Sequence, residues 1–238
     1  FVLLDEIRSD DPDDYAAGFP THPHRGIETI TYMIRGGFRH RDSRGGGGLL
    51  TDGCAQWMTA GKGILHSEMP EQTVGELWGY QLWLSLPRKH KMVEPRYQHL
   101  SPGDILRVDE GGTSVRVISG SYRGSRGPAS NWVRTHYFDV RLTDRSRFEF
   151  DVDPQMNCFL YTHSGGLKIC GDETVERALV RLERGSRVEV EGASSRDGFL
   201  FVAGVPNDEP IVRGGPFVMN TEEEIRQAFA DYRSGDLF

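Results

Sequence analysis

Apolar and polar residues alternate in many short stretches of this chain. Such alternation places successive side chains on opposite faces and is typical of a β-strand with one buried face. Within residues 81–86, one face carries Leu82, Leu84 and Leu86, and the other carries Gln81, Trp83 and Ser85. The strands predicted in this way are residues 29–34, 77–86, 113–118, 132–142, 147–152, 158–162 and 199–203. Because glycines and prolines separate these strands, the pattern predicts an all-β sandwich or barrel.

A weak internal repeat predicts two related β-domains. Residues 32–38 and residues 161–167 both read Tyr-x3-Gly-Gly followed by an apolar residue. Glycines are frequent between residues 110 and 130, where the chain would be loosest. We therefore predict an N-terminal domain of residues 1–115 and a C-terminal domain of residues 116–238.

One short helix is predicted near the C-terminus, as part of the second domain. Thr221 precedes three glutamates, and Thr221 with Glu224 forms the pattern of a capping box. The acidic first turn suits the positive end of the helix dipole. Gly235 supplies a stop signal. Apolar residues recur between these ends at helical spacing, at Ile225, Ala228, Phe229 and Tyr232. This stripe predicts a helix that packs on a sheet.

Charge and hydropathy exclude two classes of partner. The net charge is −7, whereas a general nucleic-acid-binding protein would carry a basic patch or a high isoelectric point. Acidic residues interrupt the arginines that gather between Arg116 and Arg147, so a solvated surface explains that region better. No apolar run approaches the roughly 18 residues that span a bilayer. We expect neither direct nucleic-acid binding nor membrane insertion.

The cysteines indicate a reducing compartment. Cys54, Cys158 and Cys170 are few, odd in number and far apart, and they form no CxxC motif. This usage is typical of reduced thiols in the cytoplasm, or in the nucleus of a eukaryotic cell, rather than of a disulfide framework. The chain begins at Phe1 within an apolar, strand-like stretch, so we expect that natural sequence precedes it.

Two pairs of ligand-type residues carry the candidate chemistry. His22 and His24 are separated by one residue, as are His66 and Glu68. In an extended strand, residues i and i+2 share a face, so each pair can direct two side chains at one point. Three imidazoles and one carboxylate suit a divalent transition metal such as Fe(II), Zn, Cu, Ni, Mn or Co. A structural zinc site would more often use thiolates. The set therefore favours a catalytic type of site with open coordination positions.

Glu28 lies at even spacing from both members of the first histidine pair. If the strand is regular, Glu28 shares their face as an extra ligand or a base, unless Gly26 bulges the strand. The internal repeat places Asp151 and Asp153 where the histidine pair would fall in the second domain. We therefore expect one metal per chain, in the first domain.

Five segments resemble signatures of the pirin family, within the cupin superfamily. They are His22-Pro23-His24-Arg25-Gly26, the run 56–61, His66-Ser67-Glu68-Met69-Pro70, Lys91-Met92-Val93-Glu94-Pro95 and the run 215–221. The resemblance covers nearly the whole chain and implies two tandem cupin domains, each a jelly-roll β-sandwich, with the metal in the first. It assigns the ligands to His22, His24, His66 and Glu68, and it implies that Glu28 is not used. Four residues separate Gly61 from His66, where generic cupins have two, which favours pirins.

The resemblance implies two alternative functions. Some pirin-like proteins are quercetin 2,3-dioxygenases, which open the central ring of a flavonol with O2 and release carbon monoxide. Others are non-enzymatic, metal- or redox-dependent regulators that bind a transcription factor or a metabolic enzyme. For the enzyme, which we favour, Fe(II) would bind a small aromatic or enol substrate and Glu68 would accept its hydroxyl proton. Gln81, Trp83 and Met69 would line the substrate pocket, with ordinary sandwich packing as the alternative.

Overall fold

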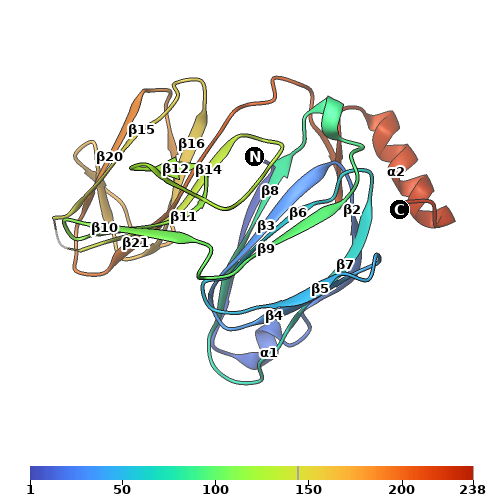
Figure 1. The fold of residues 1–238 in the computed structure, drawn as a ribbon, viewed down its shortest axis with the longest axis horizontal. Coiled ribbons are helices and arrows are strands. Elements are labelled where there is room, and N and C mark those ends of the chain that lie inside the picture. Colours follow the sequence, from blue (N-terminus) through green and yellow to red (C-terminus); the bar gives the residue numbers. More distant parts are fainter. Residues whose placement is uncertain (144, 238) are drawn as a thin grey trace. The chain divides into compact units, whose positions relative to one another are not determined.

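A computed structural model describes residues 1–143 and 145–237 and consists mainly of β-strands (Figure 1). It divides into two compact units. Unit 1 comprises residues 1–102 and 207–238, and unit 2 comprises residues 103–206. The metal-ligand candidates all belong to unit 1, which is therefore described first.

Unit 1 contains two antiparallel sheets. The five-stranded sheet has the order β1 (Leu3–Ser9), β8 (Leu77–Ser85), β3 (Ile27–Arg35), β6 (Ala55–Thr59) and β9 (Arg96–Leu100). The four-stranded sheet has the order β2 (Phe19–His24), β7 (Ile64–Pro70), β4 (Phe38–Asp42) and β5 (Gly47–Leu50). The remaining elements are α1 (Pro12–Tyr15), the 3-10 helix η1 (Arg88–His90), the hairpin β22 (Val212–Gly214) with β23 (Phe217–Met219), and α2 (Glu222–Ser234).

Two apolar clusters in unit 1 leave a polar belt between them. One cluster contains Tyr15, Met33, Phe38, Leu50, Cys54 and Leu77. The other contains Ile27, Met58, Ala60, Ile64, Trp83 and Val218. On β3, Ile27 and Met33 belong to different clusters, and the residues between them on the same face are Thr29 and Thr31. The same alternation places His66 on β7 and Gln56 on β6 in this belt. The polar belt is therefore enclosed by hydrophobic packing.

Unit 2 has a similar two-sheet organisation. Its six-stranded sheet has the order β10 (Leu106–Glu110), β11 (Thr113–Ser119), β14 (Thr135–Leu142), β21 (Asp197–Gly204), β16 (Asn157–Ser164) and β19 (Leu179–Leu182). Its four-stranded sheet has the order β15 (Arg147–Asp151), β20 (Arg187–Gly192), β17 (Leu167–Ile169) and β18 (Asp172–Glu173), and β12 (Ser121–Tyr122) pairs with β13 (Ser125–Arg126). Packed aromatic rings occupy its core, including Phe138, Phe148, Phe150, Phe199 and Phe201. These aromatic rings form the main hydrophobic cluster of unit 2.

The observed division of the chain differs from the predicted boundary after residue 115. β10 pairs along its whole length with β11, so the residues from 103 onward belong with unit 2. The segment 207–238, which we predicted to belong to the second domain, packs in unit 1 instead. There, Asn207 Nδ2 donates a hydrogen bond of 2.7 Å to the carbonyl of Ser85. Long-range packing of this kind leaves no local pattern in the sequence.

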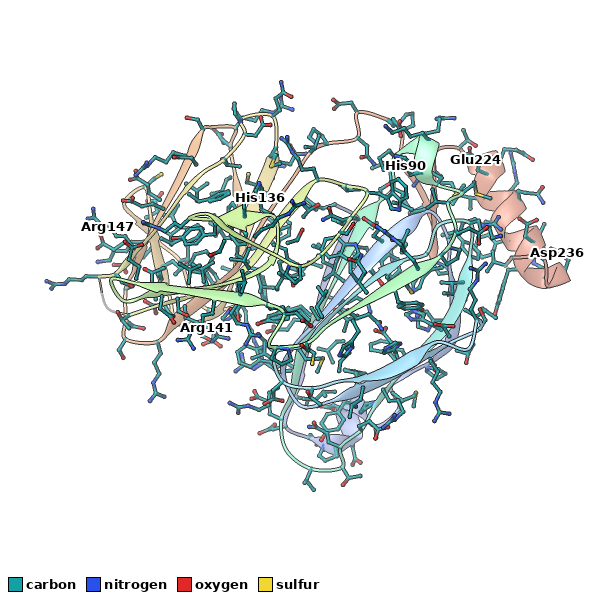
Figure 2. All side chains as sticks on the ribbon, in the orientation of Figure 1. His90, His136, Arg141, Arg147, Glu224 and Asp236 are labelled. Carbon is teal, nitrogen blue, oxygen red and sulfur yellow. The ribbon has the colours of Figure 1, made fainter. Side chains whose placement is uncertain are left out.

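The predicted elements are otherwise confirmed. The seven predicted strands correspond to β3, β8, β11, β14, β15, β16 and β21. The two repeat segments each cover a strand end, a turn with a left-handed glycine (Gly36 and Gly165), and the start of the next strand. In α2, Thr221 accepts from the Glu224 backbone and Glu224 from the Thr221 backbone, as a capping box requires. Figure 2 labels Glu224 in the first turn of this helix and Asp236 just after its end. Among the described residues, no helix combines the length and apolar character needed to cross a bilayer.

Candidate metal centre

The two ligand pairs converge because β2 and β7 are antiparallel neighbours. His22 on β2 lies directly opposite His66 on β7. His24 shares the face of His22, since residues i and i+2 of a strand point the same way. One potential ligand atom from each of His22, His24 and His66 lies within 4.8 Å of the other two. The structure therefore brings together the three histidines that the spacing singled out.

Backbone carbonyls select the ring nitrogen that each β2 histidine presents. His22 Nδ1 lies 2.8 Å from the Pro20 oxygen, and His24 Nδ1 lies 3.3 Å from the Pro216 oxygen. A carbonyl oxygen only accepts, so each Nδ1 carries the proton and each Nε2 presents a lone pair. The two Nε2 atoms face each other at 3.1 Å. Two lone pairs at this distance repel unless a cation or a proton lies between them.

A divalent metal ion fits this donor set. Two nitrogens that bind one ion at right angles, each at about 2.1 Å, lie about 3 Å apart, close to the observed separation. Both ring nitrogens of His66 are buried and have no hydrogen-bonding partner among residues 1–143 and 145–237. An unsatisfied buried polar group is costly, and coordination would satisfy it. The three-histidine cluster therefore indicates a divalent metal site.

Burial keeps the imidazoles of His24 and His66 neutral, which is the protonation state that binds metal. Burial is the main cause that lowers the pKa of His24 well below its usual value, and the neighbouring His66 and His22 lower it further. Burial likewise lowers the pKa of His66 to about 3, with further contributions from His22 and His40. At neutral pH these rings therefore carry no competing proton.

Glu68 lies on the same face of β7 as His66, and two hydrogen bonds hold its carboxylate. Thr31 Oγ1 donates to Oε1 at 2.9 Å, and Gln81 Nε2 donates to Oε2 at 2.7 Å. Gln81 is held in turn, because its Oε1 accepts from Trp83 Nε1 at 2.8 Å. Among the described residues, the close group of ligand atoms comprises the three histidines and does not include Glu68. Each carboxylate oxygen keeps a further lone pair for a metal or a proton.

Of the three residues expected to line a pocket, two lie beside this group. Gln81 contacts Glu68, and the ring of Trp83 meets that of His24 edge-on at 4.9 Å. Met69 requires a correction. Because side chains alternate along β7, Met69 points to the face opposite Glu68, and a side chain at Gly18 would meet its sulfur.

Glu28 also departs from the regular-strand expectation. Gly26 adopts a φ of +77°, and the chain passes there from β2 in one sheet to β3 in the other. Glu28 consequently faces away from the histidines and accepts a 2.8 Å hydrogen bond from Thr59 Oγ1. The sequence left open an irregularity at Gly26, and the break between β2 and β3 at this glycine is the reason.

The sequence alone did not identify several polar residues of the site. Thr31 holds Glu68, and its position could have been inferred because it alternates with the apolar face of a predicted strand. His40 lies directly opposite Glu68 on β4 and stacks on Tyr97 of β9, with ring centroids 5.6 Å apart. Neither β4 nor β9 was predicted, because their apolar and polar residues do not alternate clearly. A contact between strands of different sheets leaves no local signal.

Comparison with known proteins supports the same family as the motifs. The sequence profile described as Pirin matches residues 1–84, and that described as Pirin C-terminal cupin domain matches residues 137–238. A pirin-like protein of Caulobacter vibrioides is 43% identical over 99% of this chain and 86% of its own length. A Pseudomonas aeruginosa protein, named provisionally as a quercetin 2,3-dioxygenase, is 44% identical over 100% of this chain and 86% of its own.

The fold has a close match among solved structures. A crystal structure of quercetin 2,3-dioxygenase from Acinetobacter baumannii superposes with a TM-score of 0.92 and 32% sequence identity. The match covers 100% of this chain and 85% of that one. The two-cupin architecture expected from the sequence motifs is therefore confirmed. From the two sequence profiles and the near-complete coverage by relatives, we conclude that this chain belongs to the pirin family.

Proposed function

We propose that this protein is a metal-dependent dioxygenase that opens the central ring of a flavonol such as quercetin with O2. The observation that carries the proposal is the convergence of His22, His24 and His66 around one point, with Glu68 beside them. Similarity to proteins named as quercetin 2,3-dioxygenases supports the reaction and the substrate class.

In this proposal, His22, His24, His66 and Glu68 hold one Fe(II) ion. When bound, the ion supplies Lewis-acid polarisation and one-electron chemistry. The histidine donors are the nitrogens that no backbone carbonyl occupies. Nitrogen and oxygen ligands also accept Zn, Cu, Ni, Mn and Co, so elemental analysis of protein purified without added metal identifies the native ion.

Glu68 is the proposed base for the substrate hydroxyl. A flavonol must lose its 3-hydroxyl proton to become an electron-rich enolate, and a carboxylate within hydrogen-bond reach can accept it. Gln81 and Thr31 fix the orientation of this carboxylate, so less reorganisation is needed when the proton moves.

Trp83 and the apolar clusters would orient the aromatic substrate and exclude water. Trp83 places its ring edge-on to His24 and its indole nitrogen on Gln81. A flat aromatic ring packs favourably against such an indole. His40 offers two buried ring nitrogens that have no partner among the described residues, and these can bond to a substrate that reaches the site. Exclusion of water protects the enolate until O2 adds.

The test is turnover by protein loaded anaerobically with Fe(II). We expect O2 consumption, loss of flavonol absorbance and release of carbon monoxide in equal amounts. His66→Ala should abolish all three, whereas His90→Ala, a matched change on η1, should abolish none. If wild-type protein fails to turn over with Fe, Mn, Co, Ni, Cu and Zn alike, the dioxygenase proposal is wrong. The regulatory function would then be the remaining candidate, tested by a partner that co-purifies with only one oxidation state of the metal.

A further inference from the structure

The C-terminal segment of the chain runs beside a proposed metal ligand. The Pro216 carbonyl lies 3.3 Å from His24 Nδ1. Val218 N donates a 3.1 Å hydrogen bond to the carbonyl of Arg25, the residue that follows His24. Arg25 and Phe217 also form a parallel bridge. Residues 216–218 therefore run beside the end of β2, which we call the ligand strand because it carries His22 and His24.

A buried arginine ties this strand to α2. The Arg25 side chain is 5% exposed and makes an ion pair of 2.6 Å with Asp231 on α2. It also donates to the carbonyls of Lys62 and Leu237. The Arg25 guanidinium is the main cause that lowers the pKa of the Asp231 carboxyl, so this group stays charged. One planar side chain thus connects the ligand strand, the turn before β7 and the C-terminal helix.

A buried lysine makes a second connection at the same place. Lys91 Nζ donates to the carbonyls of Gly26 and Val218, at 2.9 and 2.7 Å, and to Ser85 Oγ at 3.0 Å. Gly26 has a φ of +77°, and a side chain there would collide with the Val218 carbonyl. β23 therefore lies close to the end of the ligand strand, and Lys91 holds the two together by bonding to a carbonyl of each segment.

We propose that the segment 207–237 is a positioning element of the metal centre. Through the Pro216 carbonyl it selects the tautomer and ring orientation of His24, and through the Arg25–Asp231 ion pair it is held in register. The inference rests on the proposed metal centre but not on the proposed reaction. Partners that orient metal-ligating histidines commonly change metal affinity about 10- to 100-fold when they are lost.

The test is metal affinity of Asp231→Asn in the full-length protein, measured with Co(II) or Zn(II) against a chelator of known affinity. Because Asp231 acts through Arg25, we expect a loss near the lower end of that range, about tenfold. The Co(II) visible spectrum should change as well, because His24 turns when its carbonyl partner moves. Glu223→Gln is the matched control. It breaks the exposed ion pair with Arg226 on the same helix and should change neither readout.

Two further variants separate positioning from simple folding. Asp231→Glu should restore most of the affinity, because it keeps the charge. Arg25→Lys keeps a cation but loses the planar fork, and it should resemble Asp231→Asn. The inference is overturned if Asp231→Asn binds Co(II) with the affinity and spectrum of Glu223→Gln, or if wild-type protein binds no metal. A protein that binds metal but turns over no flavonol removes only the proposed reaction.

Discussion

His22 and His66 lie directly opposite each other on β2 and β7, with ring centroids 4.4 Å apart. This pairing brings together two segments that are far apart in the sequence, and no disulfide links them. The surrounding apolar clusters maintain the fold, whereas His66 contributes two buried ring nitrogens that have no hydrogen-bonding partner among the described residues. Function and stability are therefore separable at this site, which leads to the first prediction.

His66→Ala should empty the metal site and preserve the fold. The free energy of unfolding of the metal-free protein should change by no more than about 2 kcal/mol, because the lost ring has no hydrogen-bonding partner among the described residues. Elemental analysis and circular dichroism of the purified variant check both parts. Retention of a full equivalent of metal would show that His66 is not a ligand.

Gln81→Leu should weaken metal binding at least tenfold without removing any ligand. The substitution takes away the 2.7 Å hydrogen bond to Glu68 and leaves Trp83 Nε1 without its acceptor. Competition with a chelator measures the change in affinity. Gln155→Leu, at an exposed position of unit 2, is the control for the chemical change itself. Equal affinities of the two variants would contradict a role for Gln81 in orienting Glu68.

The buried Lys91 predicts an unusual dependence of stability on pH. Burial lowers its pKa from 10.5 to about 8 in the folded protein. Between these values the unfolded chain binds more protons than the folded one, so the free energy of unfolding from this group rises with pH. The gain from pH 8 to pH 10.5 is roughly 3 kcal/mol at most, and the cost of the buried charge is fully present below pH 8.

Urea unfolding of wild-type protein and of Lys91→Met across this pH range isolates the contribution of Lys91. The variant should be less stable at pH 7, because the Val218 carbonyl loses the Lys91 donor and the Gly26 carbonyl keeps only its bond from Leu86 N. Its stability should lack the rise seen in the wild type. Parallel pH profiles for the two proteins would mean that Lys91 titrates normally.

Phe148→Ala should destabilise unit 2 strongly, by about 3–5 kcal/mol, because it leaves a cavity among packed rings. Phe148 is fully buried, with Phe199 and Phe201 at 5.5 and 5.6 Å between ring centroids. Leu106→Ala, where the side chain is 47% exposed, should cost far less. Chemical denaturation compares the two variants. A cost for Phe148→Ala below 1 kcal/mol would contradict the close packing of this core.

Local periodicity predicted the parts of the site that lie within one strand. Alternation placed Gln81 and Trp83 on one face of β8, and that face meets Glu68 and His24. The spacing of His22 and His24 correctly predicted that their side chains share a face for the same reason. Such predictions succeed because the direction of a side chain in a regular strand depends only on its position in the chain.

The same reasoning failed where the strand was not regular or where the partner was distant. Glu28 faces away from the histidines because the chain leaves β2 at Gly26 and enters β3, which belongs to a different sheet. Met69 follows Glu68 in sequence and for that reason points to the opposite face. Lys91 and Val218 are 127 residues apart, and no local pattern reveals their hydrogen bond.

The return of residues 207–238 to unit 1 has a consequence for biosynthesis. Residues 103–206 are continuous, so unit 2 has all of its own strands as soon as residue 206 has been made. Unit 1 must wait for α2, whose Asp231 pairs with Arg25 across 206 positions of the chain. On the ribosome, the half that is translated first therefore acquires its complete set of internal contacts last.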